Sequence, residues 1–207
     1  MKSNLNILSQ ELPDVPVVKY EDIKDEIKSG DVLFTAGDSI LSKLIRWLTG
    51  SPWSHVGFVM RHDFIDRNMV FESVDSKGVR IITLKSYMED FECSGKPYKG
   101  AVALARLDDF EATAKELNDL GSFGADLMGS NYDWLELVRI GYRILWYKLT
   151  KSAYKRLGPG NKLYICTEYL RECFLKVGVE FPPTMGNFMA PKDFAEYPHL
   201  KIYAIIE

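Results

Sequence analysis

The feature that most constrains the fold is a series of short strand-like runs, most of which stand close together in the first half of the chain. They are residues 31–35, 54–60, 69–74, 78–84 and 99–107, and one more run, 200–206, lies near the end of the sequence. Each is rich in β-branched, aromatic or other apolar residues, and most are separated by segments that contain Gly, Pro, Asp or Ser. Runs with such short connections pair as hairpins, so they predict an antiparallel sheet or a partial barrel.

Helical spacing of apolar residues marks most of the remaining chain, at 20–28, 39–48, 108–128, 134–149 and 163–177. Residues 1–19 contain two prolines and little periodicity, and we expect them to form an irregular arm. The length of 207 residues suits one domain. We therefore predict an α+β fold over residues 30–207, with helices packed on one side of the sheet, preceded by an arm and a short helix over 1–29.

Composition excludes several classes of protein and site. Lys and Arg total 26 against 29 Asp and Glu, which gives a formal charge of −3 and argues against nucleic acid as a partner. The cysteines form no C-x-x-C pair and there is no HExxH motif, so we expect no disulfide framework, no metal and no cofactor. We find neither a signal peptide nor an apolar run of roughly 18 residues. We expect a cytoplasmic protein, with a peripheral position at a membrane as the alternative.

Cys166 and His55 combine a reactive side chain with a setting that would make it reactive. Cys166 lies in or near the first turn of a predicted helix for which Asn161 is a candidate cap, and a helix start favours the nucleophilic thiolate. The alternative is a small buried apolar residue on the same stripe as Cys173. His55 shares one face of its strand with Gly57, which leaves room for a partner, although a lone strand histidine is more often structural.

Glu72 is the candidate partner of His55. If strands 54–60 and 69–74 pair in the register that places residue 55 opposite residue 72, the two side chains project from one face with Cβ atoms roughly 5 Å apart. The carboxylate would then orient the imidazole, and the alternative is that Glu72 lies on a solvated face. Together with Cys166 the pair forms the Cys-His-acid arrangement of covalent acyl transfer, which is recognised by roles and not by chain order.

Five segments resemble a known family. They are GDVLFTAG (30–37), LSKLIRWLTGSPWSHVGFV (41–59), VFES (70–73), GSNYDW (129–134) and YICTEYL (164–170). They are similar to the circularly permuted branch of the NlpC-type papain-like superfamily, the YiiX-like proteins, which are distant cousins of the lecithin:retinol acyltransferase-like proteins. The order His55, Glu72, Cys166 is that of the permuted branch. The resemblance implies a papain-like core in which a cysteine at the start of a helix packs on a sheet that carries the histidine.

The resemblance also implies an activity. His55 falls on the histidine of the family's SHVG motif, Glu72 on its third polar residue, and Cys166 on the cysteine of its C-[ST]-E motif. We therefore predict a cysteine hydrolase that cleaves an amide or ester bond in a cell-wall peptide or in a lipid or acyl substrate. Four residues beside the matching motifs are candidate substrate-binding residues: Trp47, Trp53, Tyr132 and Asp133. The alternatives are an acyltransferase with the same triad and a non-catalytic membrane-binding module of the same fold.

Residues 139–162 carry a local excess of positive charge. The segment contains seven basic residues, Arg139, Arg143, Lys148, Lys151, Lys155, Arg156 and Lys162, and no acidic residue occurs from Leu137 to Thr167. Tyr and Trp are interleaved with the basic residues, a mixture that suits an anionic membrane surface. The alternative is a buried helix followed by an ordinary basic loop. We predict peptide or lipid substrates as partners, and an anionic membrane surface bound through 139–162.

Overall fold

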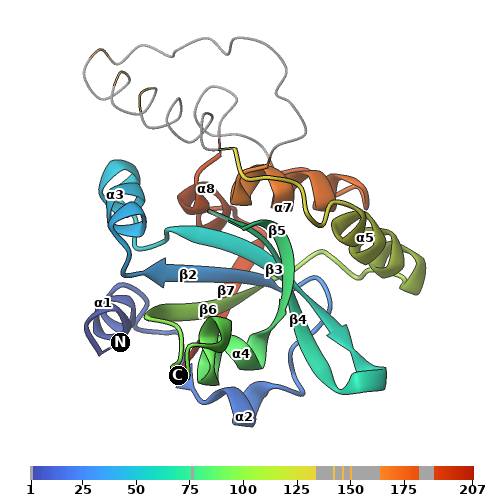
Figure 1. Ribbon diagram of the computed structural model, residues 1–207, viewed down its shortest axis with the longest axis horizontal. Helices are drawn as coiled ribbons and strands as arrows, with labels where there is room; N and C mark the ends of the chain where they lie inside the picture. Colours follow the sequence, from blue (N-terminus) through green and yellow to red (C-terminus); the bar gives the residue numbers. More distant parts are fainter. Residues whose placement is uncertain are drawn as a thin grey trace.

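A computed structural model describes residues 2–75, 77–133, 164–181 and 189–207, and within the remaining stretch Tyr142, Trp146 and Thr150. In these residues seven strands form one open sheet with the order β1-β7-β6-β2-β3-β4-β5 (Figure 1). The strands are β1 (Val17–Val18), β2 (Val32–Gly37), β3 (His55–His62), β4 (Arg67–Val74), β5 (Gly78–Thr83), β6 (Gly100–Leu107) and β7 (Leu200–Ile206). All neighbours are antiparallel except β1 and β7. The predicted antiparallel sheet of an α+β fold is therefore confirmed.

The described helices are α1 (Lys2–Glu11), α2 (Tyr20–Ile23), α3 (Ile40–Thr49), α4 (Leu84–Glu89), α5 (Ala114–Asp126), α7 (Cys166–Leu175) and α8 (Pro191–Ala195), with short 3₁₀ turns η1 (Asp63–Ile65) and η2 (Phe91–Cys93). The expectation of an irregular arm over 1–19 is wrong, because α1 occupies most of it. The helix predicted to start at 108 begins at Ala114, where Thr113 and Glu116 form a reciprocal capping box. The helix predicted over 134–149 lies outside the described residues, apart from Tyr142 and Trp146, which are helical.

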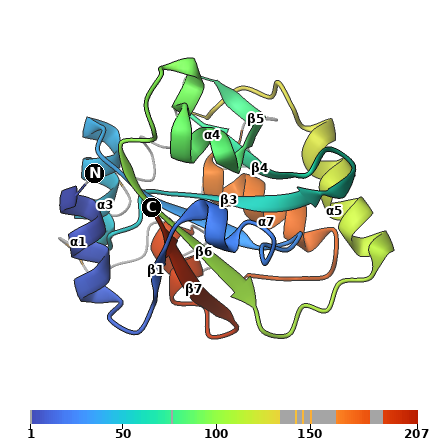
Figure 2. The ribbon, with the colours of Figure 1, turned by 90° about the horizontal axis from the view of Figure 1, so that it is seen from below.

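Both faces of the sheet are covered, so the prediction of helices on one side only is wrong. On one face, residues such as Phe34 and Phe58 pack in a cluster that includes residues of α5, α7 and α8. On the other face, Leu33 and Val59 belong to a cluster that includes residues of α2 and α4. Figures 1 and 2 show α7 and α4 on opposite sides of the strands. The run VLFTA in β2 is nearly continuous in apolar residues, and such a strand must bury both of its faces.

The N-terminal segment contributes to both clusters. Leu8 of α1 is buried in the first cluster, while Tyr20, Ile23 and Ile27 are buried in the second. The side chain of Asn4 also donates a hydrogen bond of 3.1 Å to the carbonyl of Ala36 in β2. Residues 2–29 therefore pack as part of the same core as the sheet.

Close packing of α5 on α7 fixes the position of α7 over β3 and β4. The hydroxyl of Tyr169 in α7 donates a 2.9 Å hydrogen bond to the carbonyl of Gly124 in α5. A Cβ atom at Gly124 would lie only 2.9–3.0 Å from atoms of Tyr169, Phe58 and Phe71. Glycine at this position therefore allows the two helices to approach. None of the described helices is long and apolar enough to cross a membrane.

Candidate active site

Cys166 is the first residue of α7, and its position is held by the neighbouring strand. Ile165 before it has an extended backbone and provides no side-chain cap, and the predicted cap Asn161 lies outside the described residues. The hydroxyl of Ser73 in β4 donates a 2.6 Å hydrogen bond to the carbonyl of Tyr164, two residues before Cys166. Because Ser73 is fully buried and follows Glu72 directly, this contact ties the start of the helix to the strand that carries the candidate carboxylate.

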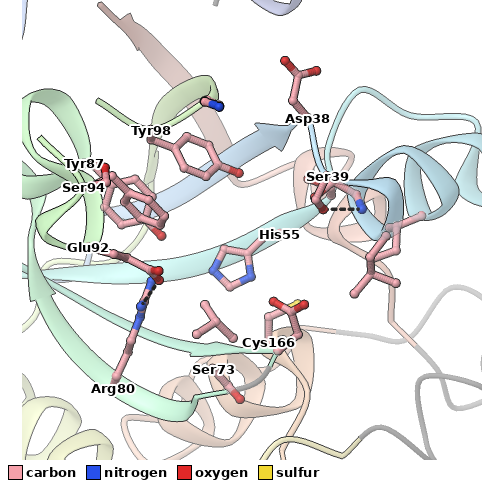
Figure 3. A pocket seen from close by; sticks show the side chains of 18 of the residues that line it. Asp38, Ser39, His55, Ser73, Arg80, Tyr87, Glu92, Ser94, Tyr98 and Cys166 are labelled. Atoms are coloured by element: carbon pink, nitrogen blue, oxygen red, sulfur yellow. Dashed lines mark hydrogen bonds and ion pairs between the residues drawn. The ribbon is translucent and has the colours of Figure 1, made fainter. Parts of the chain in front are cut away.

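His55 is the first residue of β3, and the backbone around it is fixed by hydrogen bonds. It pairs with Thr35 of β2. The buried hydroxyl of Ser54 donates to the carbonyl of Thr35 and accepts from the backbone N–H of Gly37. In Figure 3 the imidazole and the Cys166 side chain lie in the same pocket. The structure therefore brings these two predicted residues together.

Glu72 contacts His55, but not through the predicted register. The imidazole Nε2 lies 2.8 Å from Oε2 of Glu72. Strands β3 and β4 pair Phe58 with Phe71, which by continuation places Gly57, and not His55, opposite Glu72. The expected register was therefore wrong by two residues. An even offset keeps both side chains on one face of the sheet, which is why the contact survives.

Gly57 leaves the space that this diagonal contact needs. A Cβ atom at this position would lie 3.2 Å from the Cβ of Glu72 and 2.8 Å from the carbonyl oxygen of Phe71. A larger residue would push against the strand that holds the carboxylate. The sequence therefore predicted that Gly57 leaves room beside His55, but it did not predict that Glu72 lies opposite Gly57.

Arg80 and Tyr87 complete the surroundings of Glu72, and neither residue was predicted from the sequence. Arg80 on β5 places Nε 2.8 Å and Nη2 2.7 Å from Oε1 of Glu72, and the hydroxyl of Tyr87 in α4 donates to Oε2. Burial alone would raise the pKa of the fully buried carboxyl, but His55, Arg80 and Tyr87 outweigh it, so the pKa of Glu72 is lowered. Glu72 is therefore held as a carboxylate.

The same groups set the charge of His55. Burial opposes protonation of the imidazole, but hydrogen bonds to Cys166 and Glu72 and their negative charges raise its pKa from 6.5 to about 10. With Nε2 engaged by Glu72, Nδ1 is the ring nitrogen that remains for Cys166. The site is therefore arranged around an imidazolium between the carboxylate of Glu72 and the sulfur of Cys166.

These residues open onto a pocket of about 770 Å³. Its wall includes Cys166, His55 and Tyr132, together with residues of α3, of the β4–β5 hairpin and of the stretch 91–99. Figure 3 shows Arg80 and Glu92 paired at one side of His55. Cys166 and His55 thus face a space large enough for a substrate chain.

The four predicted substrate-binding residues are placed differently from one another. Tyr132 lines the pocket. Trp47 lies on α3 and is 66% exposed, while Trp53 is buried in the core, with its ring 5.2 Å from that of Phe34. Asp133 is buried as well. Of the four, only Tyr132 is among the residues that line the described pocket.

Neither of the other two cysteines is among the residues that line the described pocket. Cys93 is exposed in η2, and Cys173 is fully buried in the core beside Tyr169. Burial raises the pKa of Cys173 to about 12, although the hydrogen bond with Tyr169 opposes the shift. Cys166 also packs in the apolar cluster of α7, yet it reaches the pocket, which distinguishes it from Cys173.

Two proteins of Escherichia coli are similar to the chain. "Probable lipoprotein peptidase YaeF" of strain K12 is 23% identical over 196 residues, which cover 86% of this chain and 65% of that protein. The chain thus spans less than two thirds of that relative. YiiX of strain O157:H7, whose crystal structure is titled as that of a metalloprotein, has a TM-score of 0.59 at 16% identity, over 86% of this chain and 97% of that one. The second similarity shows a shared fold.

The residues of the candidate site do not fit a metal centre. In the part of the chain that the structure describes, no three His, Cys, Asp or Glu side chains form a group that could hold a metal ion. Both carboxylate oxygens of Glu72 are already engaged by His55, Arg80 and Tyr87.

A family match covers most of the chain. The family is described as "Permuted papain-like amidase enzyme, YaeF/YiiX, C92 family", and it matches residues 26–202. The matched range contains Cys166, His55 and Glu72, and it includes six of the seven described strands in whole or in part. The chain therefore belongs to the permuted papain-like amidases of the C92 family, as its motifs led us to expect.

Proposed function

We propose that this protein is a cysteine hydrolase that cleaves an amide or ester bond through an acyl-enzyme formed on Cys166. The observation that carries the proposal is the 2.8 Å contact between His55 and the buried Glu72, with His55 and Cys166 both lining one pocket. A cysteine, a histidine and a carboxylate in these positions match the roles of nucleophile, general base and orienting group. Membership of a family described as amidases supports the same chemistry.

The reaction would proceed in two halves. In the first, the sulfur of Cys166 attacks the substrate carbonyl as a thiolate while His55 holds the proton. The N–H of the first residue of a helix has no partner within the helix, so the Cys166 N–H can stabilise the oxyanion. His55 then donates its proton to the leaving amine or alcohol, and a thioester remains. In the second half His55 takes a proton from water, the hydroxide adds to the thioester, and the acid leaves with Cys166 restored.

Glu72 and Arg80 support this cycle without touching the substrate carbonyl. Glu72 keeps the imidazole in one orientation and stabilises its charged form. Arg80 fixes the carboxylate from the opposite side and is itself held by Glu92. Tyr132 also lines the pocket, and burial and neighbouring negative groups raise its pKa, so its hydroxyl stays neutral.

The pocket favours substrates that combine apolar and polar parts. Leu41 and Ile45 of α3 form an apolar wall, and polar or charged residues such as Asp75, Ser94 and Lys96 line other parts of the pocket. A peptide linked to an acyl or lipid chain presents both kinds of surface. The relative named as a lipoprotein peptidase points to the same substrate class.

Hydrolysis is favoured over acyl transfer because the side chain of His55 is partly exposed at the wall of the pocket, so water can reach the thioester. An acyltransferase would use the same intermediate with an alcohol or amine acceptor. A non-catalytic membrane-binding module is disfavoured, since such a module has no need for a buried carboxylate with three partners.

A substrate panel tests the proposal. Purified protein is assayed with p-nitrophenyl esters of increasing acyl length and with peptide p-nitroanilides, with and without glycerol as an acyl acceptor. We expect release of the free acid by the natural chain and by Cys93→Ala, and none by Cys166→Ala. Equal turnover by Cys166→Ala would disprove the proposal, and transfer to glycerol in place of the free acid would establish the acyltransferase.

A further inference from the structure

Helix α3 presents an apolar stripe to solvent. None of its ten residues is buried. Ile40, Leu44 and Trp47 are 89%, 47% and 66% exposed, and their spacing of four and three residues places them along one face of the helix. In Figure 1 the helix stands at the edge of the molecule, where a single connection joins it to the end of β2. An apolar face this exposed indicates a surface that binds something.

An adjacent flank of the same helix belongs to the pocket. Leu41 and Ile45 line the cavity that contains Cys166 and His55. Whatever binds the outer stripe is therefore brought next to the mouth of the site. A single helix thus links an external apolar surface to the candidate nucleophile.

Charge indicates which partner the stripe fits. Helix α3 contains Lys43 and Arg46, and no acidic residue occurs from Ser39 to His62, although the chain has a formal charge of −3. A second copy of the chain on this face would bring two basic helices together. An anionic lipid surface instead complements the positive charge and accepts the apolar stripe, and tryptophan is favoured at the boundary between lipid and water.

We propose that α3 binds the surface of an anionic lipid membrane, with Ile40, Leu44 and Trp47 inserted at the level of the headgroups and Lys43 facing the phosphates. The mouth of the pocket then lies at the membrane surface, where a lipid-linked substrate would be presented. The consequence for the substrate rests on the proposed function, but the binding itself does not. The basic segment 139–162, for which the sequence predicts membrane binding, lies outside the described residues, except for Tyr142, Trp146 and Thr150.

The test uses the full chain with Cys166→Ala, so that binding is measured without turnover. Flotation with phosphatidylcholine vesicles and with vesicles containing 30% phosphatidylglycerol should show binding to the anionic vesicles and little to the neutral ones. Replacing Ile40 and Leu44 together by Ser should lower the partition coefficient by about tenfold or more. The matched control is Phe64→Ser: this side chain is 94% exposed in η1, at the far end of the β3–β4 hairpin, and its loss should change nothing.

A charge pair tests the electrostatic part. Lys43 and Lys201 are 59% and 62% exposed, and each lies 3.9 Å from one aspartate. Strand pairing places them at opposite ends of the sheet, since Gly37 pairs with Gly100 near α3 and Leu107 pairs with Leu200. Lys43→Glu should weaken binding to anionic vesicles, whereas Lys201→Glu should not.

Several results would overturn the proposal. The first is equal binding to neutral and anionic vesicles, and the second is no binding to either. The third is an equal loss of binding in the α3 variants and in the control variants Phe64→Ser and Lys201→Glu. A Trp47→Phe variant gives a readout that does not depend on vesicle recovery, because it should remove most of the fluorescence blue shift that anionic vesicles cause. Turnover of a soluble ester by the Ile40 and Leu44 variant with Cys166 intact should stay unchanged. A failure of membrane binding therefore does not contradict the proposed function. A failure of the proposed function likewise does not contradict membrane binding by α3.

Discussion

Replacing Glu72 by Gln should separate the role of its charge from the role of its shape. The side chain is fully buried and accepts hydrogen bonds from His55, Arg80 and Tyr87. An amide has one oxygen, so its NH₂ group must face either Arg80, which only donates, or the pair formed by His55 and Tyr87. In both orientations Arg80 loses its buried charge partner and keeps only Glu92.

The magnitudes follow from these contacts. Removing one partner of a buried ion pair costs about 3–5 kcal/mol of unfolding free energy, and Glu92 should keep the loss near the lower end. The pKa of His55 should fall from about 10 toward 6.5 because a neutral amide does not stabilise the imidazolium. Turnover should fall by roughly 10³–10⁴-fold, the scale found when the acid of a catalytic triad becomes an amide.

Three measurements check this variant: urea denaturation, NMR titration of the His55 ring, and turnover of the best ester of the panel. Glu92→Gln is the control, because Glu92 shares Arg80 with Glu72 but is partly exposed, and its removal should cost less than about 1 kcal/mol. Wild-type turnover together with a His55 pKa near 10 in Glu72→Gln would refute the assigned role of the carboxylate. A matching loss in Glu92→Gln would show that the effect belongs to Arg80.

Three further predictions follow from the same contacts. With limiting iodoacetamide at neutral pH, Cys166 should be labelled faster than the exposed Cys93, while the buried Cys173 stays unlabelled. The His55→Ala variant should slow the labelling of Cys166 only. Labelling is mapped by mass spectrometry, and an equal slowing at Cys93 would contradict this prediction. The pKa of His55 is raised on folding, so its contribution to stability is complete below about pH 6.5 and is lost as the pH rises through about 10. The difference in unfolding free energy between the natural chain and His55→Gln should therefore shrink over that pH range. A difference that stays constant would be inconsistent with the raised pKa. Gly124→Ala should lower the unfolding free energy by about 1–3 kcal/mol, because its Cβ would meet Tyr169 and two core rings; a neutral result in chemical denaturation would show that α5 can shift.

The sheet could be predicted because its strands are short, apolar and separated by turn residues, so each run is recognised locally. Registers are less local. The β3–β4 pairing was wrong by two residues because η1 lies in the connection and changes the count of residues in the turn. The pairing of Glu72 with Arg80 was accessible, since Val74 and Gly78 flank the β4–β5 turn and fix which residues face each other.

Other parts of the site had no local signal. Tyr87 reaches Glu72 from a different helix, and the hydrogen bond of Ser73 to Tyr164 joins residues that are 91 positions apart. The second covered face of the sheet was missed because residues 1–19 contain two prolines and resemble an arm, so the short helix predicted after them was not expected to pack on the sheet. Its buried residues Tyr20, Ile23 and Ile27 are nevertheless spaced as one face of a helical stretch.

The central claim is that Cys166 forms an acyl-enzyme with the help of His55, and trapping that intermediate tests it most directly. The protein is mixed with the best ester, quenched in acid within seconds and analysed by intact mass and by peptide mapping. We predict one added acyl group on Cys166 in the natural chain, lost on a longer incubation, and at least a hundredfold slower formation in His55→Ala, on the order of the contribution of a general base. An acyl group on Cys93 alone, or formation at an equal rate in His55→Ala, would contradict the account.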